Sequence, residues 1–191
     1  MTRLFMVRHG PTHAKTFVGW SDLPADLSDT AALARLDAHL PPDGVVISSD
    51  LIRASATADA IQNKRTRLPH DPDLRELNFG DWELKAFTDI ENNDPERARA
   101  YWDNPGEVRP PNGESWNDAR GRVDRVIDRL LETHSGRDLI VVAHFGVILT
   151  QVQRALNIGG YETFGHRIDN LSVTEIGTHP QWNAMRINHI P

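Results

Sequence analysis

The chain has 191 residues, of which 39% are hydrophobic and 25% are charged, so it is long enough to bury one full hydrophobic core. Its formal net charge of -6 disfavours a general nucleic-acid or anionic-membrane binder, because such proteins carry a broad positive field. The absence of cysteine excludes disulfides and thiol nucleophiles, and no apolar run approaches the roughly 20 residues that span a bilayer. We therefore expect one cytoplasmic domain over residues 1–191, with no nucleic-acid or membrane partner.

The first third of the chain alternates strand and helix patterns. Residues 4–7 (LFMV) form a short apolar run before a glycine, which is typical of a strand buried on both faces. Residues 30–40 carry leucines at helical spacing and end at two prolines, and residues 45–47 (VVI) resemble a second buried strand. An alanine-rich helix over residues 51–62 follows. This pattern predicts a βαβ unit with a parallel strand pair.

The rest of the chain continues the alternation. Ser115 is a good N-cap for a long helix with one apolar stripe. The other expected elements are helical pieces over 86–102, a proline-rich loop over 104–115, a strand over 138–142, a helix over 147–156 and closing strands over 171–176 and 182–190. Together these patterns predict an α/β three-layer sandwich, with a mostly parallel sheet and helices on both faces.

Two arginines and two histidines follow the ends of three expected strands. Arg8 and His9 follow the first strand, Arg53 comes shortly after the second, and His144 follows the strand over 138–142. In sheets of this kind, ligands bind beyond the carboxyl ends of the strands, where helix N-termini also favour anions. The sequence therefore predicts a phosphate pocket at this edge.

The chemistry of these side chains favours phosphoryl transfer. Arginine offers a planar fork of donors that holds two phosphoryl oxygens, and its charge persists at any working pH. A neutral histidine can attack phosphorus and form a covalent intermediate, so His9 is the natural nucleophile. Arg8, Arg53 and a protonated His144 would then neutralise the charge on the transferred group.

The leaving oxygen also needs a proton donor. Glu76, Asp81 and Glu83 lie in the segment LRELNFGDWE and are the candidates. A carboxyl group beside a dianionic phosphate has a raised pKa, because the like charges repel, and this suits a general acid near neutral pH. This reasoning leaves the choice among the three open.

The chain resembles the histidine phosphatase superfamily, in its phosphoglycerate mutase-like branch. RHGPT at residues 8–12 matches the family's RHG[EP]T motif, whereas RHG alone is usually a turn after a strand. Further segments resemble family segments in the family's order and span nearly the whole chain: GWSDLPADLS (19–28), SSDLIRASATA (48–58), LRELNFGDWE (74–83), NGES (112–115) and VVAHFGVI (141–148).

The resemblance implies a role for each matched residue. His9 would become the phosphohistidine, and Arg8, Arg53 and His144 would form the phosphate pocket. Glu76 would be the proton donor and later the base that activates water. The resemblance also implies that no metal or other cofactor is needed.

Substrate selection is expected from two further regions. By the same resemblance, Thr12, Lys15 and Gly19 would contact the substrate, and a cap-like insertion over about 84–113 would cover the site. Relatives commonly have asparagine where this chain has Lys15, so an extra positive charge is expected near the phosphate.

We therefore expect a phosphatase that hydrolyses a small phosphorylated metabolite through a phosphohistidine. Phosphoglycerate mutase-type transfer is an alternative, although mutases of the family are longer and have extra cap elements. A non-catalytic phospholigand-binding protein is a second alternative. The GDWE and NGES segments also look similar to those of α-ribazole phosphatases and broad-specificity phosphatases. Exposed residues in the last strand or in the insertion could support a homodimer.

Overall fold

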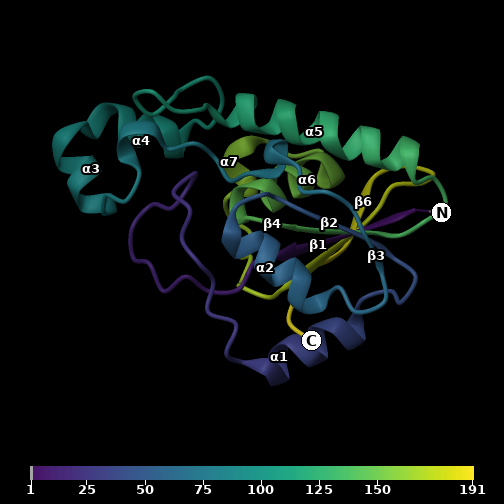
Figure 1. Ribbon diagram of the computed structural model, residues 1–191. Helices are drawn as coiled ribbons and strands as arrows, with labels where there is room; N and C mark the ends of the chain where they lie inside the picture. Colours follow the sequence, from purple (N-terminus) through teal and green to yellow (C-terminus); the bar gives the residue numbers. More distant parts are fainter. Residues whose placement is uncertain (1) are drawn as a thin grey trace.

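A mixed six-stranded sheet forms the centre of the protein (Figure 1). In the computed structural model, which describes residues 2–191, the strand order is β3-β2-β4-β1-β5-β6. The strands are β1 (Arg3–Arg8), β2 (Val45–Ser48), β3 (Thr66–Arg67), β4 (Leu139–Ala143), β5 (Val173–Gly177) and β6 (Asn183–His189). The first four in this order are parallel, and the closing pair β5 and β6 is antiparallel. The predicted mostly parallel α/β sheet is confirmed.

The apolar run of β1 is buried on both faces because side chains alternate along a strand. Leu4 and Met6 pack into one hydrophobic cluster, and Phe5 and Val7 pack into the other. The first cluster is covered by α5 (Trp116–Thr133) and α6 (Phe145–Leu156), and the second by α1 (Thr30–His39) and α2 (Ile52–Ile61). Figure 1 shows α5 and α6 above the sheet and α1 and α2 below it, which is the predicted three-layer arrangement.

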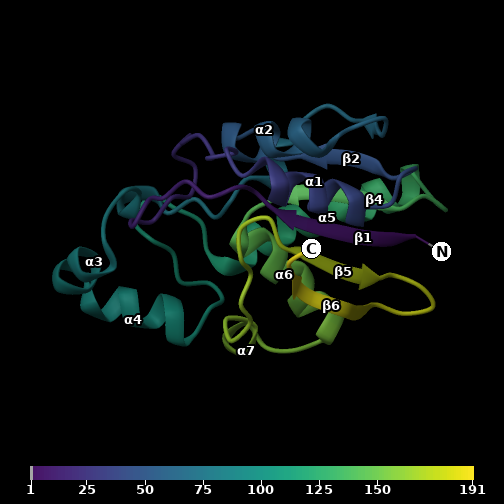
Figure 2. The ribbon, with the colours of Figure 1, turned by 90° about the horizontal axis from the view of Figure 1, so that it is seen from below.

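The insertion contains two short helices, α3 (Phe87–Asn93) and α4 (Pro95–Asp103). Asp94 separates them, and its carboxylate caps α4 by accepting from the Arg97 N–H at 3.4 Å. The helical pieces predicted over 86–102 are thus confirmed. Figure 2 shows both helices beyond the sheet, on the side opposite the N-terminus and therefore toward the carboxyl end of β1.

Local capping fixes the start of the long helix α5. The Ser115 side chain accepts from the Asp118 N–H at 3.1 Å, and the Asp118 carboxylate accepts from the Ser115 N–H at 2.9 Å, which forms a capping box. The predicted N-cap is confirmed. The helix expected over 147–156 begins two residues earlier, at Phe145, because His144 is its cap.

A short helix, α7 (Gly160–Thr163), lies between α6 and β5 in the sequence. No helix within residues 2–191 is both long and apolar enough to cross a membrane.

Candidate active site

His9 and His144 lie side by side at the carboxyl ends of β1 and β4. The parallel register places Arg8 opposite Ala143, and the His9 N–H donates to the Ala143 carbonyl at 3.1 Å. The centroids of the two imidazole rings are 5.1 Å apart, and both residues are buried. The convergence that the sequence predicts for these two strand ends is therefore present in the fold.

The His9 ring is held in one orientation and one tautomer. Its Nδ1–H donates to the Gly10 carbonyl at 2.6 Å, because a carbonyl oxygen can only accept, and this leaves the Nε2 lone pair free in the neutral ring. The Asn170 side chain donates to the His9 carbonyl at 2.8 Å and fixes the backbone. Burial lowers the pKa of His9 to about 3, and the charges of Arg53 and Arg8 act in the same direction. His9 is thus an uncharged imidazole at neutral pH.

The depressed pKa of His9 makes the folded state sensitive to acid. In the unfolded chain His9 takes up a proton below about pH 6.5, whereas in the folded protein it does so only near pH 3, so stability falls as the pH falls between these values. Relative to a His9→Asn variant, the wild type should lose about 2 kcal/mol of unfolding free energy between pH 8 and pH 5. Urea titrations of both proteins at the two pH values measure this difference, and parallel pH dependences would contradict the assigned shift.

His144 is uncharged in the free protein as well. Burial is the largest cause that lowers its pKa well below the ordinary value, followed by the charges of His9 and Arg53. Both of its ring nitrogens are buried and make no hydrogen bond to the described residues. Burial therefore opposes the protonated His144 that the sequence leads us to expect, and its charged form beside a bound phosphate stays a prediction.

Arg53 is buried at the start of α2, and backbone carbonyls hold it there. Its Nη1 donates to the Ser21 carbonyl at 2.8 Å, and its Nη2 donates to the Gly19 carbonyl at 2.6 Å. A Cβ atom at residue 19 would lie 2.1 Å from the Leu77 carbonyl oxygen, so this close approach requires glycine. The Gly19 N–H also donates, to Glu83 at 3.0 Å. The backbone N–H and carbonyl of Gly19 therefore both have partners within the protein. A contact between Gly19 and the substrate stays a prediction.

Arg8 is the second guanidinium of the predicted pocket. Its Nη1 donates to the Ile168 carbonyl at 2.6 Å, and its guanidinium lies 5.5 Å from the centroid of the Phe145 ring. Burial lowers its pKa, and the nearby carboxylate of Glu76 opposes this shift. An arginine stays charged under these conditions, so Arg8 and Arg53 bring two positive charges to the two histidines.

Glu76 is buried against the start of α6. Both of its carboxylate oxygens lie 3.1 Å from the Gly146 N–H, and Oε1 also accepts from the Leu77 N–H at 3.0 Å. Burial raises the pKa of Glu76, while these two N–H donors and the arginines oppose the shift. A buried carboxyl with a raised pKa near two cationic side chains has the properties of a general acid.

The other two acid candidates have structural partners instead. The carboxylate of Asp81 accepts from the Asn112 side chain at 3.1 Å. The Glu83 carboxylate accepts from the backbone N–H groups of Gly19, Trp20, Ser21 and Phe79 and from the Ser21 hydroxyl. These bonds show that Glu83 anchors the loop that also holds Arg53. The geometry therefore favours Glu76 as the acid, which the sequence pattern alone left open.

The loop after β1 carries the remaining predicted substrate contacts. Lys15 is exposed and takes part in none of the ion pairs found within residues 2–191. Thr12 is half-buried, and its hydroxyl accepts from the Ala14 N–H at 3.4 Å. His13, at a φ of 58°, pairs with Asp26 at 2.8 Å. Substrate contacts of Thr12 and Lys15 stay predictions.

Tyr101 is a candidate substrate-binding residue that the sequence reasoning missed. This residue of α4 is buried, and its hydroxyl makes no hydrogen bond to the described part of the chain. Burial raises its pKa, and the nearby charges of Glu76 and Glu114 raise it further. Its neighbour Trp102 stacks on Phe17 with the ring centroids 5.6 Å apart. The aromatic content of the insertion was the one available signal, but it did not show that Tyr101 is buried with its hydroxyl unpartnered.

The same side chains do not form a group of metal ligands. Among residues 2–191, no three histidine, aspartate or glutamate side chains are arranged so that they could hold a metal ion. The polar groups that converge are the two arginines, the two histidines and the carboxyl of Glu76. This set of donors suits an anion with several oxygens.

Known proteins resemble this chain in both sequence and structure. The sequence model of the histidine phosphatase superfamily (branch 1) matches residues 4–189. The adenosylcobalamin/alpha-ribazole phosphatase of Escherichia coli (strain K12) is 29% identical, over 97% of this chain and 94% of its own, and that of Salmonella typhimurium is 31% identical, over 87% and 86%. The alpha-ribazole phosphatase of Shigella flexneri superposes with a TM-score of 0.80 at 25% identity, over 98% of this chain and 96% of its own. A mycobacterial glucosyl-3-phosphoglycerate phosphatase superposes with a TM-score of 0.86 at 25% identity, over 100% of both chains.

Proposed function

Because the chain belongs to the histidine phosphatase superfamily (branch 1), we propose that it hydrolyses a small phosphomonoester through a phosphohistidine on His9. The family and its phosphatase relatives support phosphatase activity. The observation that carries the mechanism is the state of His9, a neutral imidazole whose Nδ1–H is bound to Gly10. Its free Nε2 lies among two arginines and a second histidine, where a phosphoryl group would find both a nucleophile and compensating charge.

In the first step, the phosphoryl group moves from the substrate to the enzyme. The Nε2 lone pair of His9 forms a bond to phosphorus while the bond between phosphorus and the leaving oxygen breaks. Glu76 gives its proton to that oxygen, so the alcohol leaves uncharged and Glu76 becomes a carboxylate. Arg8 and Arg53 stabilise the charge on the phosphoryl oxygens, and the negative phosphate would raise the pKa of His144 toward its charged form.

In the second step, water takes the place of the alcohol. The Glu76 carboxylate accepts a proton from the water molecule, whose oxygen attacks phosphorus while the bond to His9 Nε2 breaks. Inorganic phosphate leaves, His9 regains its lone pair and Glu76 regains its proton. The proposed cycle uses no metal, since Arg8, Arg53 and a protonated His144 would supply the charge that a cation would otherwise bring.

Inorganic phosphate release by the wild-type protein tests this function. The substrates are 4-nitrophenyl phosphate and a panel of phosphorylated metabolites, each with an excess of chelator. We expect metal-independent release, with one metabolite class turned over much faster than the others. Binding of inorganic phosphate without turnover of any ester would instead support a phospholigand-binding protein. Transfer to an added acceptor without release of free phosphate would support mutase activity.

The relatives limit the substrate class. Two of the relatives described above are named as an adenosylcobalamin/alpha-ribazole phosphatase and a glucosyl-3-phosphoglycerate phosphatase, so each is named for a phosphorylated metabolite. We infer a small phosphorylated metabolite for this chain as well. The insertion would select it, because its helix α4 carries the buried Tyr101, whose pKa is raised by burial and by the charge of Glu76.

Lys15 tests whether the loop after β1 contributes to substrate binding. Replacing it by alanine should raise KM by about 3- to 10-fold for a substrate with a second anionic group and leave kcat unchanged, because an exposed charge contributes about 1 kcal/mol. The effect should shrink as salt is added. Lys64→Ala is the matched control, since Lys64 is also exposed but follows the end of α2 that lies away from Arg53. A salt-independent change, or an equal change in the control, would exclude this role.

A further inference from the structure

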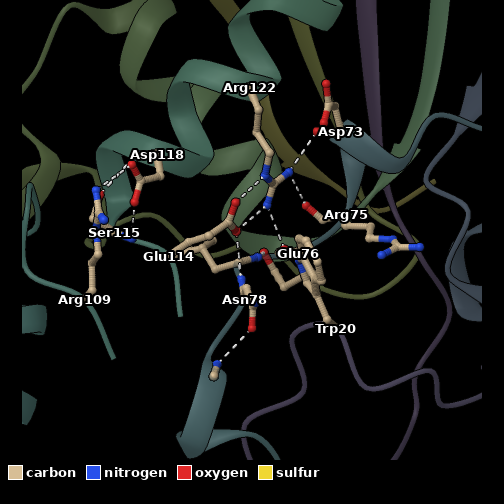
Figure 3. Close-up of polar contacts among 12 residues, drawn as sticks. Trp20, Asp73, Arg75, Glu76, Asn78, Arg109, Glu114, Ser115, Asp118 and Arg122 are labelled. Carbon is tan, nitrogen blue, oxygen red and sulfur yellow. Dashed lines mark hydrogen bonds and ion pairs between the residues drawn. The ribbon is translucent and has the colours of Figure 1, made fainter. Parts of the chain in front are cut away.

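Arg122 of α5 uses every N–H group of its guanidinium (Figure 3). Its Nε and Nη2 donate to the Glu114 carboxylate at 2.8 and 2.9 Å. Its Nη1 donates to the carbonyls of Asp73 and Arg75, at 2.8 and 2.7 Å, and Nη2 also donates to the Glu76 carbonyl at 2.8 Å. All five donors are therefore used, and three of them hold the backbone that carries the proposed acid.

Glu114 completes the clamp from its own side. Its carboxylate accepts from the Asn78 N–H at 2.9 Å, and its backbone N–H donates to the Asn78 carbonyl at 2.9 Å. The Trp20 indole N–H adds a bond to the Glu76 carbonyl at 2.8 Å. Figure 3 shows the Arg122 and Glu114 side chains meeting above this backbone segment.

The clamp acts where regular structure gives no support. A 3₁₀ turn ends at Leu74, and residues 76–79 belong to no helix or strand, so the Glu76 carbonyl has no partner from a neighbouring strand or helical turn and is bound by side chains instead. The Glu76 carboxylate is fixed to α6 through Gly146, and the Glu76 carbonyl is fixed to α5 through Arg122. Two helices thus hold opposite ends of the same residue.

We propose that Arg122 and Glu114 are positioning residues that set the location of the Glu76 carboxyl for proton transfer. This inference rests on the proposed function, in which Glu76 is the general acid. Arg122 is 6% exposed and all its donors are bound within the protein, so it acts through Glu76 and does not bind the substrate. A displacement of about 1 Å in a catalytic group lowers the rate by about 100-fold, so a loosened clamp has a measurable effect.

The test compares two substrates that differ in their need for a proton. The 4-nitrophenolate of 4-nitrophenyl phosphate leaves readily as an anion, whereas the alkoxide of 2-glycerophosphate requires protonation. The quantity measured is kcat/KM, which reports the step that forms the phosphohistidine. Arg122→Lys keeps the charge but loses the fork, and it should lower kcat/KM at least about tenfold more for the alkyl ester than for the aryl ester. Glu114→Gln should change the ratio of the two kcat/KM values, alkyl ester to aryl ester, in the same direction. If Arg122→Lys does not fold, Glu114→Gln alone tests the inference.

One further variant separates a failed inference from a failed mechanism. Glu76→Gln should show the largest selective loss for the alkyl ester. If its losses are equal for both esters, the role of Glu76 in the proposed function is wrong. If Glu76→Gln is selective while Arg122→Lys and Glu114→Gln lower both esters equally, the clamp is only structural and the inference is overturned.

Arg65→Lys controls for the general cost of altering a buried arginine. The Arg65 side chain is 4% exposed, pairs with Asp37 and donates to carbonyls of Pro41 and Leu40, on the opposite face of the sheet. Its replacement should lower the melting temperature by an amount similar to Arg122→Lys. The ratio of the two kcat/KM values should stay at the wild-type value.

Discussion

Replacing His9 by alanine should lower kcat/KM for a phosphomonoester by at least about 1000-fold. The variant loses the proposed nucleophile, while the two arginines are left in place to bind the phosphate. Wild-type protein mixed with ³²P-labelled 4-nitrophenyl phosphate and quenched in alkali should carry the label, because phosphohistidine is stable in base. The variant should carry none.

His9→Asn separates the loss of the nucleophile from loss of packing. An asparagine amide can keep a donor near the Gly10 carbonyl, yet it cannot attack phosphorus. We expect this variant to be as inactive as His9→Ala and to be better folded. His179→Ala, at an exposed histidine in the turn between β5 and β6, should retain wild-type activity. Turnover by His9→Asn within tenfold of wild type would rule out the covalent route.

The buried strands and the long helix could be predicted because their signals are local. The apolar run of residues 4–7 requires burial on both faces, and it lies at the centre of the sheet with helices above and below. Ser115 and Asp118 cap α5 through contacts three residues apart, which the sequence shows directly. In contrast, β3 has only two residues, which are too few to show the alternating pattern of a strand in the sequence. It is defined only by its pairing with β2.

The position of the site could be predicted from the strand order, but not the state of its groups. The rule for carboxyl ends of parallel strands brings His9 and His144 together, as found. The pKa of His144 depends on burial and on neighbours far along the chain, and together these lower it well below the ordinary value. Composition cannot supply this information.

The choice among the three acid candidates illustrates the same difference. Glu76 and Glu83 are seven residues apart and are both glutamates, so a sequence pattern alone does not tell which of them is the general acid. The fold assigns Glu83 to the amide groups of a loop more than 60 residues away, whereas Glu76 faces Gly146. The clamp by Arg122 spans 46 to 49 residues of sequence, and its guanidinium looks like any other helix-surface arginine until α5 is placed against the segment.

Gly146 provides the second prediction of large effect. A Cβ atom at this position would lie 2.6 Å from Glu76 Oε1 and 2.1 Å from Leu77 Cδ1, both closer than real contacts allow. Gly146→Ala should therefore displace the Glu76 carboxyl, lower kcat/KM by about 100-fold and cost about 1 to 3 kcal/mol of stability. Phosphate release and urea unfolding measure the two effects.

The same substitution in α5 separates this steric effect from the general effect of alanine in a helix. At Gly121 the nearest atom to a new Cβ is Arg125 Nη1 at 3.7 Å, an ordinary contact, so Gly121→Ala should keep full activity and gain about 0.5 to 1 kcal/mol. The selective loss for an alkyl ester, expected for the clamp variants, should also appear in Gly146→Ala, because both changes move the same carboxyl from opposite sides. If Gly146→Ala is fully active, the Glu76 carboxyl does not need the position it holds against α6, and its assignment as the proton donor fails.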